Sequence, residues 1–129
     1  MELRILVVDD SETTRGIIRA IVHSREWTVC EEASSGWEGL SKFEATKPDL
    51  VLIDLAMPDL NGFEVARRMA SLDSKVPLIL FTVLDIIGLE KQAHAAGIKA
   101  VVSKAQAWDL VRVIENTAGS IRNDPGLTH

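Results

Sequence analysis

The stretch Leu50-Val51-Leu52-Ile53-Asp54 decides the fold of this chain. Its four consecutive aliphatic residues are typical of a strand that is buried on both faces of a parallel sheet. A carboxylate follows them directly, and Met57-Pro58 interrupts the chain soon afterwards. The stretch therefore predicts a central strand with an acidic side chain at its carboxyl end.

Other apolar runs repeat this pattern along the chain. The run that contains Glu31 and Glu32 is expected at an edge of the sheet, where water reaches charged side chains. In chain order, the expected strands are Leu3–Val8, Thr28–Ala33, Leu50–Ile53, Pro77–Phe81 and Ala100–Val102.

Amphipathic stretches follow the runs and have the apolar spacing of helices. We expect the last three helices at Gly62–Ser71, Asp85–Ala96 and Trp108–Ile121, and Gly97 is typical of a helix end. Ser35, with Glu38 three residues later, predicts a capping box for the second helix. The apolar positions expected to face the core are Ile17, Ile18, Ile21, Val22, Trp37, Leu40, Phe43, Ala66, Met69, Ala70, Ile86, Leu89, Ala93, Ala96, Ala107, Leu110, Val111, Ile114, Ala118 and Ile121.

Five successive βα units predict an α/β fold, in which helices cover both faces of a five-stranded parallel sheet. The 129 residues fit one domain with a single core. We place this domain at residues 1–122. The cluster Asn123-Asp124-Pro125-Gly126 breaks regular structure, so residues 123–129 are expected to form a flexible tail.

The composition excludes several classes of protein. A net charge of −5 argues against direct binding to nucleic acid. The apolar runs are too short to span a bilayer, and the first residues lack the features of a signal peptide. Cys30 is the only cysteine, which excludes an internal disulfide framework and fits a reducing compartment. We therefore expect a cytoplasmic protein with no membrane partner.

Polar side chains stand where four of the strands end. Asp9 and Asp10 follow the first strand, Asp54 the third, Thr82 the fourth and Lys104 the fifth. In open α/β sheets, ligands bind at the carboxyl ends of the strands. These residues, far apart in the sequence, are thus expected to meet in one cleft.

The charges of this group indicate a divalent cation. Three crowded carboxylates repel one another unless a cation intervenes, and Mg²⁺ is commonly held by carboxylates, waters and phosphate oxygens. Neither histidine nor cysteine stands at these strand ends, which disfavours zinc or copper. A metal ion, a lysine and a hydroxyl around one carboxylate suit phosphoryl transfer, with Asp54 as the nucleophile.

Each residue also has a purely structural interpretation. An acidic pair after a strand is often a helix cap, and Asp10 or Ser11 fits that role. Asp54 alone fits a turn, Thr82 alone a strand end and Lys104 alone a solvated surface. The joint pattern at four strand ends makes such a coincidence improbable.

The ordered set of motifs resembles the receiver domain of bacterial response regulators over about residues 3 to 121. The segments that carry the resemblance are Ile5-Leu6-Val7-Val8-Asp9-Asp10-Ser11, Pro48 to Pro58, Asp59-Leu60-Asn61-Gly62-Phe63-Glu64-Val65, Phe81-Thr82 and Ser103-Lys104. The resemblance implies a flavodoxin-like sheet with the strand order 2-1-3-4-5. It also implies a two-component signalling switch and not an enzyme, beyond catalysis of its own phosphorylation and dephosphorylation.

The resemblance further implies the roles of the site residues. Asp54 would accept a phosphoryl group from a sensor histidine kinase or a phosphotransfer protein. Lys104 would pair with Asp54 and then with the phosphoryl group, and Thr82 would turn its hydroxyl to a phosphoryl oxygen. The Mg²⁺ ligands would be Asp9, Asp10, Asp54 and the backbone carbonyl of Ala56.

Two departures from the family pattern concern the transmission of the signal. Ala105 stands where the family usually has proline, so we predict a trans Lys104–Ala105 peptide, because a cis bond before a non-proline residue costs about 3 kcal/mol. Val101 stands where an aromatic residue commonly changes rotamer with the threonine. The usual relay from hydroxyl to aromatic ring is therefore not expected.

Three other departures concern the acceptor. Val83 replaces a very small residue and is expected to narrow access to Asp54. Ala56 and Leu84 lie two residues beyond Asp54 and Thr82, and neither can orient a hydrolytic water. Slow self-dephosphorylation is the expected result.

Several alternatives stay open from the sequence. One is an interaction module with a receiver fold that phosphorylation does not regulate. Another is a small phosphatase with an aspartyl nucleophile, which Ala56 disfavours because enzymes that resemble haloacid dehalogenases need an aspartate there. The downstream partner is either a protein target or an output domain removed from a longer regulator. A dimer through Asp85–Ala96, Ala100–Val102 and Trp108–Ile121 also stays open.

Overall fold

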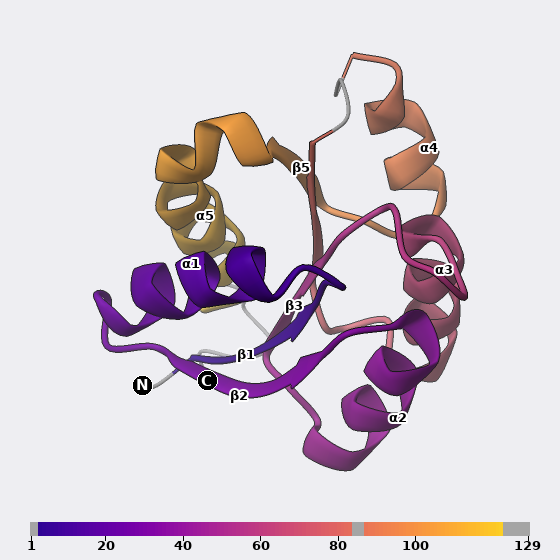
Figure 1. The fold of residues 1–129 in the computed structure, drawn as a ribbon, viewed down its shortest axis with the longest axis horizontal. Helices are drawn as coiled ribbons and strands as arrows, with labels where there is room; N and C mark the ends of the chain where they lie inside the picture. The colour runs from indigo at the N-terminus through magenta and orange to yellow at the C-terminus, as the bar shows by residue number, and fades with distance from the viewer. Residues whose placement is uncertain (1–2, 84–86, 123–129) are drawn as a thin grey trace.

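A computed structural model describes residues 3–83 and 87–122, with side chains described as far as residue 119. Its centre is a five-stranded parallel sheet with the strand order β2-β1-β3-β4-β5 (Figure 1). The strands are β1 (Arg4–Val8), β2 (Thr28–Ala33), β3 (Leu50–Ile53), β4 (Leu78–Thr82) and β5 (Ala100–Ser103). The predicted order is confirmed, with the glutamate-containing β2 at an edge.

Helices lie on both faces of this sheet, as predicted. They are α1 (Glu12–His23), α2 (Gly36–Thr46), α3 (Gly62–Leu72), α4 (Leu89–Ala95) and α5 (Leu110–Arg122), with the 3₁₀ helix η1 (Lys104–Asp109) before α5. Figure 1 shows α1 and α5 together on one face, and α2, α3 and α4 on the other.

The core therefore has two halves, one on each face of the sheet. Along β1, Leu6 and Val8 pack toward α2, α3 and α4, whereas Ile5 and Val7 pack toward α1 and α5. Since successive side chains of a strand point to opposite faces, a strand buried on both faces has to be apolar throughout. This explains the uninterrupted aliphatic runs.

Local capping sets where the helices begin. Ser11 and not Asp10 caps α1, because its hydroxyl accepts the Thr14 N–H at 3.2 Å. Ser35 caps α2 by accepting the Glu38 N–H, and the Glu38 carboxylate accepts the Ser34 N–H. The capping pattern is thus present, with the return bond one residue before Ser35.

The structure corrects several predictions of burial. Ile17 and Trp37 were expected in the core, but they are 48% and 53% exposed. In α5, Val113 and not Val111 packs against the core, beside Leu110 and Ile114. These side chains lie at the borders of their apolar stripes, where a small helix rotation decides which of two neighbours is covered.

The helix bounds also differ at two places. The fourth helix begins at Leu89, later than predicted, and the predictions for Leu84, Asp85 and Ile86 concern residues outside the described part. The last helical segment begins at Lys104 as a 3₁₀ helix, which is earlier than predicted.

The Lys104–Ala105 peptide is trans, as predicted. The predicted tail and the side chain of Ile121 lie outside the described part. Within the described part, no helix is long and apolar enough to cross a membrane.

Candidate functional site

Parallel pairing of the strands brings the predicted site residues to one edge of the sheet. Val8 pairs with Ile53, so the residues that follow them, Asp9 and Asp54, leave the sheet side by side. The Asp54 N–H donates to the Val8 carbonyl at 2.9 Å and continues this ladder past the last paired residues. The backbone therefore places both carboxylates at the carboxyl ends of the central strands.

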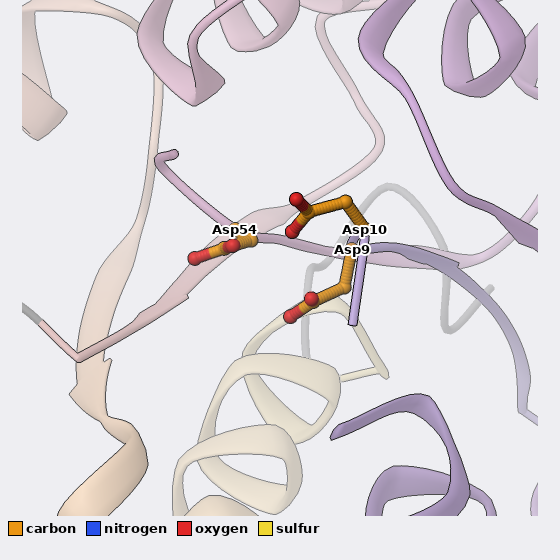
Figure 2. A group of neighbouring side chains, drawn as sticks. All are labelled: Asp9, Asp10 and Asp54. Atoms are coloured by element: carbon orange, nitrogen blue, oxygen red, sulfur yellow. The ribbon is translucent and has the colours of Figure 1, made fainter. Parts of the chain in front are cut away.

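Three carboxylates form a compact cluster at this edge. Asp9, Asp10 and Asp54 each offer an oxygen, and these oxygens lie within 4.8 Å of one another. Figure 2 shows Asp9 and Asp10 leaving the end of β1 and Asp54 leaving the end of β3, with their carboxylates turned to the same side. Asp9 and Asp54 are buried, whereas Asp10 is exposed. The cluster is therefore buried on one side and open to water at Asp10.

Lys104 supplies the positive charge of the cluster. Its Nζ lies 2.8 Å from Asp9 Oδ2 and 3.5 Å from Asp54 Oδ2, and the lysine side chain is only 14% exposed. The expected pairing with Asp54 is thus present, although the shorter contact is with Asp9. Lys104 reaches both because it directly follows β5 and begins η1.

The pKa of the Asp54 carboxyl is raised above its ordinary value. The main cause is burial, followed by the negative charge of Asp9, and both disfavour the ionised form. The charge of Lys104, its hydrogen bond and the Leu55 N–H oppose the rise. One lysine thus leaves Asp54 short of positive charge.

The donor set of this cluster fits Mg²⁺. Hard carboxylate oxygens from more than one strand converge, and Asp10 leaves a side open for water ligands. The three carboxylates also outnumber the one ammonium group beside them, and this excess of negative charge favours the binding of a cation. The described residues of the cluster include neither a histidine nor a cysteine that would favour zinc.

Thr82 and Ala56 lie where the sequence places them relative to the strands. Thr82 is the last residue of β4, is fully buried and pairs with Ser103 of β5. Ala56 lies in the loop after β3, with its side chain exposed. Val83 is also exposed, at 72%, so the expectation that it narrows access to Asp54 stays a prediction.

Asp59, whose role the sequence does not indicate, ties the loop after β3 to α2. The Asp59 carboxylate accepts the backbone N–H groups of Gly36, Trp37 and Leu60 at 2.8, 2.9 and 2.8 Å. These bonds, that from Trp37 first, lower the pKa of Asp59 to about 2. An aspartate after a proline indicates a turn, but no pattern in the sequence predicts that its carboxylate binds the N–H groups of Gly36 and Trp37, more than 20 residues away.

Gly62 keeps the other end of this loop in contact with the end of β3. Its N–H donates to the Leu55 carbonyl at 2.8 Å. A Cβ at this position would lie 2.5 Å from the Asp54 carbonyl oxygen and 2.9 Å from Leu55 Cα. Only glycine allows this close approach of α3 to the backbone of Asp54 and Leu55.

Comparison with known proteins gives one consistent match. The family model described as "Response regulator receiver domain" matches residues 5–115. The chain is 30% identical over 117 residues to the chemotaxis protein CheY of Listeria monocytogenes, an alignment that covers 90% of this chain and 98% of that protein.

Solved structures agree with this match. A two-component response regulator of the LuxR family from Aurantimonas sp. SI85-9A1 superposes with a TM-score of 0.88, at 27% identity, over 99% of this chain and 94% of that one. A CheY-like response regulator receiver domain protein from Methanospirillum hungatei JF-1 superposes with a TM-score of 0.87, at 26% identity, over 95% and 98% of the two chains.

Proposed function

Because this chain belongs to the response regulator receiver domain family, we propose that it accepts a phosphoryl group on Asp54 and so switches a protein-binding surface. The observation that carries the proposal is the cluster of Asp9, Asp10 and Asp54 with Lys104 between two of its carboxylates. A buried carboxylate next to a cation site and a mobile ammonium group is the arrangement that phosphoryl transfer to an aspartate needs.

Each residue has a role in this proposal. Asp9, Asp10, Asp54 and the backbone carbonyl of Ala56 would hold Mg²⁺, which supplies positive charge against the developing negative charge of the transferring group. A carboxylate oxygen of Asp54 forms a bond to phosphorus while the bond between phosphorus and the nitrogen of a donor histidine breaks. The electron pair of that broken bond stays on the histidine nitrogen.

Lys104 and Thr82 would respond to the new phosphoryl group. The Lys104 ammonium lies between Asp9 and Asp54, so it can shift to a phosphoryl oxygen without leaving the site. Thr82 ends the strand next to β3 and would direct its hydroxyl to another phosphoryl oxygen. The ammonium would neutralise negative charge on the phosphoryl group, and the hydroxyl would stabilise it by donating a hydrogen bond.

The proposed donor is a sensor histidine kinase or a phosphotransfer protein, and the proposed receiver is a downstream protein or an output domain. We place the phosphoacceptor unit at residues 1–122 in the cytoplasm, where such donors phosphorylate their partners. Val101 is partly buried against the core beneath α2, α3 and α4 and cannot swing as an aromatic ring does. Output through α4, β5 and α5, including a dimer, would therefore depend on backbone or loop movement.

Mass spectrometry of the intact protein tests the acceptor. After incubation with a small phosphodonor and Mg²⁺, the wild type should gain the mass of one phosphoryl group. Asp54→Asn should gain none, whereas Asp49→Asn, at the amino end of the same strand, should react as the wild type does. An unmodified wild type would refute the proposal and favour a receiver-fold interaction module that phosphorylation does not control.

A further inference from the structure

Arg15 of α1 contacts the backbone of the acidic cluster and not its carboxylates. Its Nη1 donates to the backbone carbonyl of Asp9 at 2.6 Å. The other nitrogens of the guanidinium bind Glu12 Oε2 at 2.6 Å and Glu32 Oε1 at 3.1 Å. With 12% of its side chain exposed, Arg15 joins the end of β1, the first turn of α1 and the edge strand β2.

The carbonyl that accepts this bond belongs to the Asp9–Asp10 peptide, which joins two of the three residues of the cluster. The orientation of this peptide determines where the chain carries the Asp10 side chain relative to Asp9. Asp9 has its own restraints, because Asp9 Oδ1 accepts the Ser11 N–H at 2.9 Å and Oδ2 binds Lys104. Asp9 therefore does not depend on Arg15 alone.

Asp10 differs from Asp9 in this respect. Within residues 3–83 and 87–122, no hydrogen bond or ion pair is made by the Asp10 carboxylate, which is exposed. Its position is determined by its backbone, which side chains restrain on both sides: Arg15 binds the preceding carbonyl, and Asp9 Oδ1 accepts the following N–H of Ser11. Loss of the Arg15 bond would leave the Asp9–Asp10 peptide without a side-chain hydrogen bond, and only the Ser11 side of Asp10 would stay restrained.

We propose that Arg15 is a positioning residue for the cation site, which holds the Asp9–Asp10 peptide so that the Asp10 carboxylate stays directed into the cluster. This inference rests on the proposed function, because it takes the cluster as a Mg²⁺ site. The guanidinium suits the task, since its planar donors bind one carbonyl and two carboxylates at once. Partners behind metal ligands typically contribute 10-fold to 100-fold in metal affinity.

Arg19 is a matched control on the same helix. It binds both oxygens of Glu32, at 2.6 and 2.7 Å, but makes no contact with Asp9. Changing either arginine to glutamine removes one positive charge beside Glu32 and, by electrostatics alone, should tighten Mg²⁺ binding slightly. Only the loss of the bond from Arg15 to the Asp9 carbonyl is expected to weaken it, so the two effects have opposite signs.

Calorimetric titration with Mg²⁺ compares the wild type, Arg15→Gln and Arg19→Gln. We expect the dissociation constant to rise about 10-fold in Arg15→Gln and to stay the same or fall slightly in Arg19→Gln. Without metal, the amide ¹⁵N resonance of Asp10 should shift in Arg15→Gln and not in Arg19→Gln, because a hydrogen bond to a carbonyl polarises the adjoining amide.

The possible results separate this inference from the function beneath it. If the wild type binds Mg²⁺ and Arg15→Gln binds it as tightly or more tightly, the role of Arg15 is refuted and the metal site stands. A wild type that binds no Mg²⁺ refutes the metal site, and the inference with it. If Arg15→Gln does not fold, Arg15→Lys replaces it. A several-fold loss is expected if a shifted Asp10 ¹⁵N resonance shows that the ammonium no longer binds the Asp9 carbonyl, and wild-type affinity if the resonance is unshifted. Any other combination of affinity and resonance would refute the inference.

Discussion

Substitution of Gly62 by alanine tests whether the close approach of α3 to the end of β3 is as tight as the geometry indicates. The added methyl group would lie 2.5 Å from the Asp54 carbonyl oxygen and 2.9 Å from Leu55 Cα. Both contacts are with backbone, which cannot turn aside as a flexible side chain does. The loop therefore has to shift as a whole, and Asp54 with it.

The cost can be worked from these contacts. Overpacking in a well-packed interior costs about 1–3 kcal/mol, and two backbone clashes place Gly62→Ala near the upper end, at about 3 kcal/mol. For 129 residues, the entropy of unfolding is about 0.27 kcal/mol/K at roughly 2.1 cal/mol/K per residue. The melting temperature should therefore fall by about 11 °C.

Gly119→Ala is the control. Gly119 lies in α5, and a Cβ there would meet nothing within 4 Å. This change should stabilise the protein by about 0.5–1 kcal/mol, or about 2–4 °C, because alanine favours the helix and restricts the unfolded chain.

Calorimetry of the wild type and both variants, together with the phosphodonor reaction, measures these effects. Gly62→Ala should also take up phosphoryl groups more slowly, because relief of the clash moves the backbone of Asp54. A melting temperature of Gly62→Ala within about 2 °C of the wild type would refute the reasoning. It would mean that the loop after β3 adjusts freely and does not hold Asp54 in place.

Three further predictions concern other parts of the molecule. Asp59→Asn should lower the free energy of unfolding at pH 7. The asparagine oxygen can still accept the Gly36 and Leu60 N–H groups, but its NH₂ group would then face the Trp37 N–H, and two donors cannot bond to each other. Since the pKa of Asp59 is depressed to about 2 in the folded protein, its contribution to stability is complete above the unfolded pKa of about 4 and is lost as the pH falls toward 2. Denaturation by urea should therefore show that the difference in unfolding free energy between wild type and variant shrinks over that range. A difference independent of pH would contradict this. Ala56→Asn should speed the decay of the phosphorylated protein, measured by mass spectrometry, because an amide can orient the hydrolytic water; an unchanged rate would count against this explanation. Arg68 lies 4.8 Å from the Trp37 ring centroid, so Arg68→Ala should cost about 0.5–1 kcal/mol in thermal unfolding, and Arg67→Ala, which has no such ring contact, should cost less.

Much of the fold could be predicted because each strand carries its own signal. Thr28–Ala33 and Leu50–Ile53 were predicted with the bounds that the structure shows, and the other strands differ by a residue or two at most. Burial on both faces forces an aliphatic residue at every position of a central strand, so the run itself marks the strand. Ile17 and Trp37 were misplaced because helical periodicity defines a stripe but not its edges.

The candidate site was predictable for a related reason. Asp9, Asp54, Thr82 and Lys104 interrupt or follow apolar strands, and the carboxyl ends of parallel strands meet at one edge. The convergence of Asp9, Asp10 and Asp54 agrees with this expectation, although their binding of Mg²⁺ stays a prediction. The closer pairing of Lys104 with Asp9 than with Asp54 was not predictable, since differences of less than 1 Å depend on packing around η1.

The sequence by itself determined the strands, their parallel arrangement and the residue types at the strand ends, because hydrophobic periodicity is a local property of the chain. Only the tertiary structure decided which groups restrain those residues. Arg15 on the Asp9 carbonyl, Asp59 on the N-terminus of α2 and Gly62 against Asp54 are polar or backbone contacts between separate elements. Such contacts require two segments to meet at one distance and angle, and no local pattern in either segment encodes that meeting.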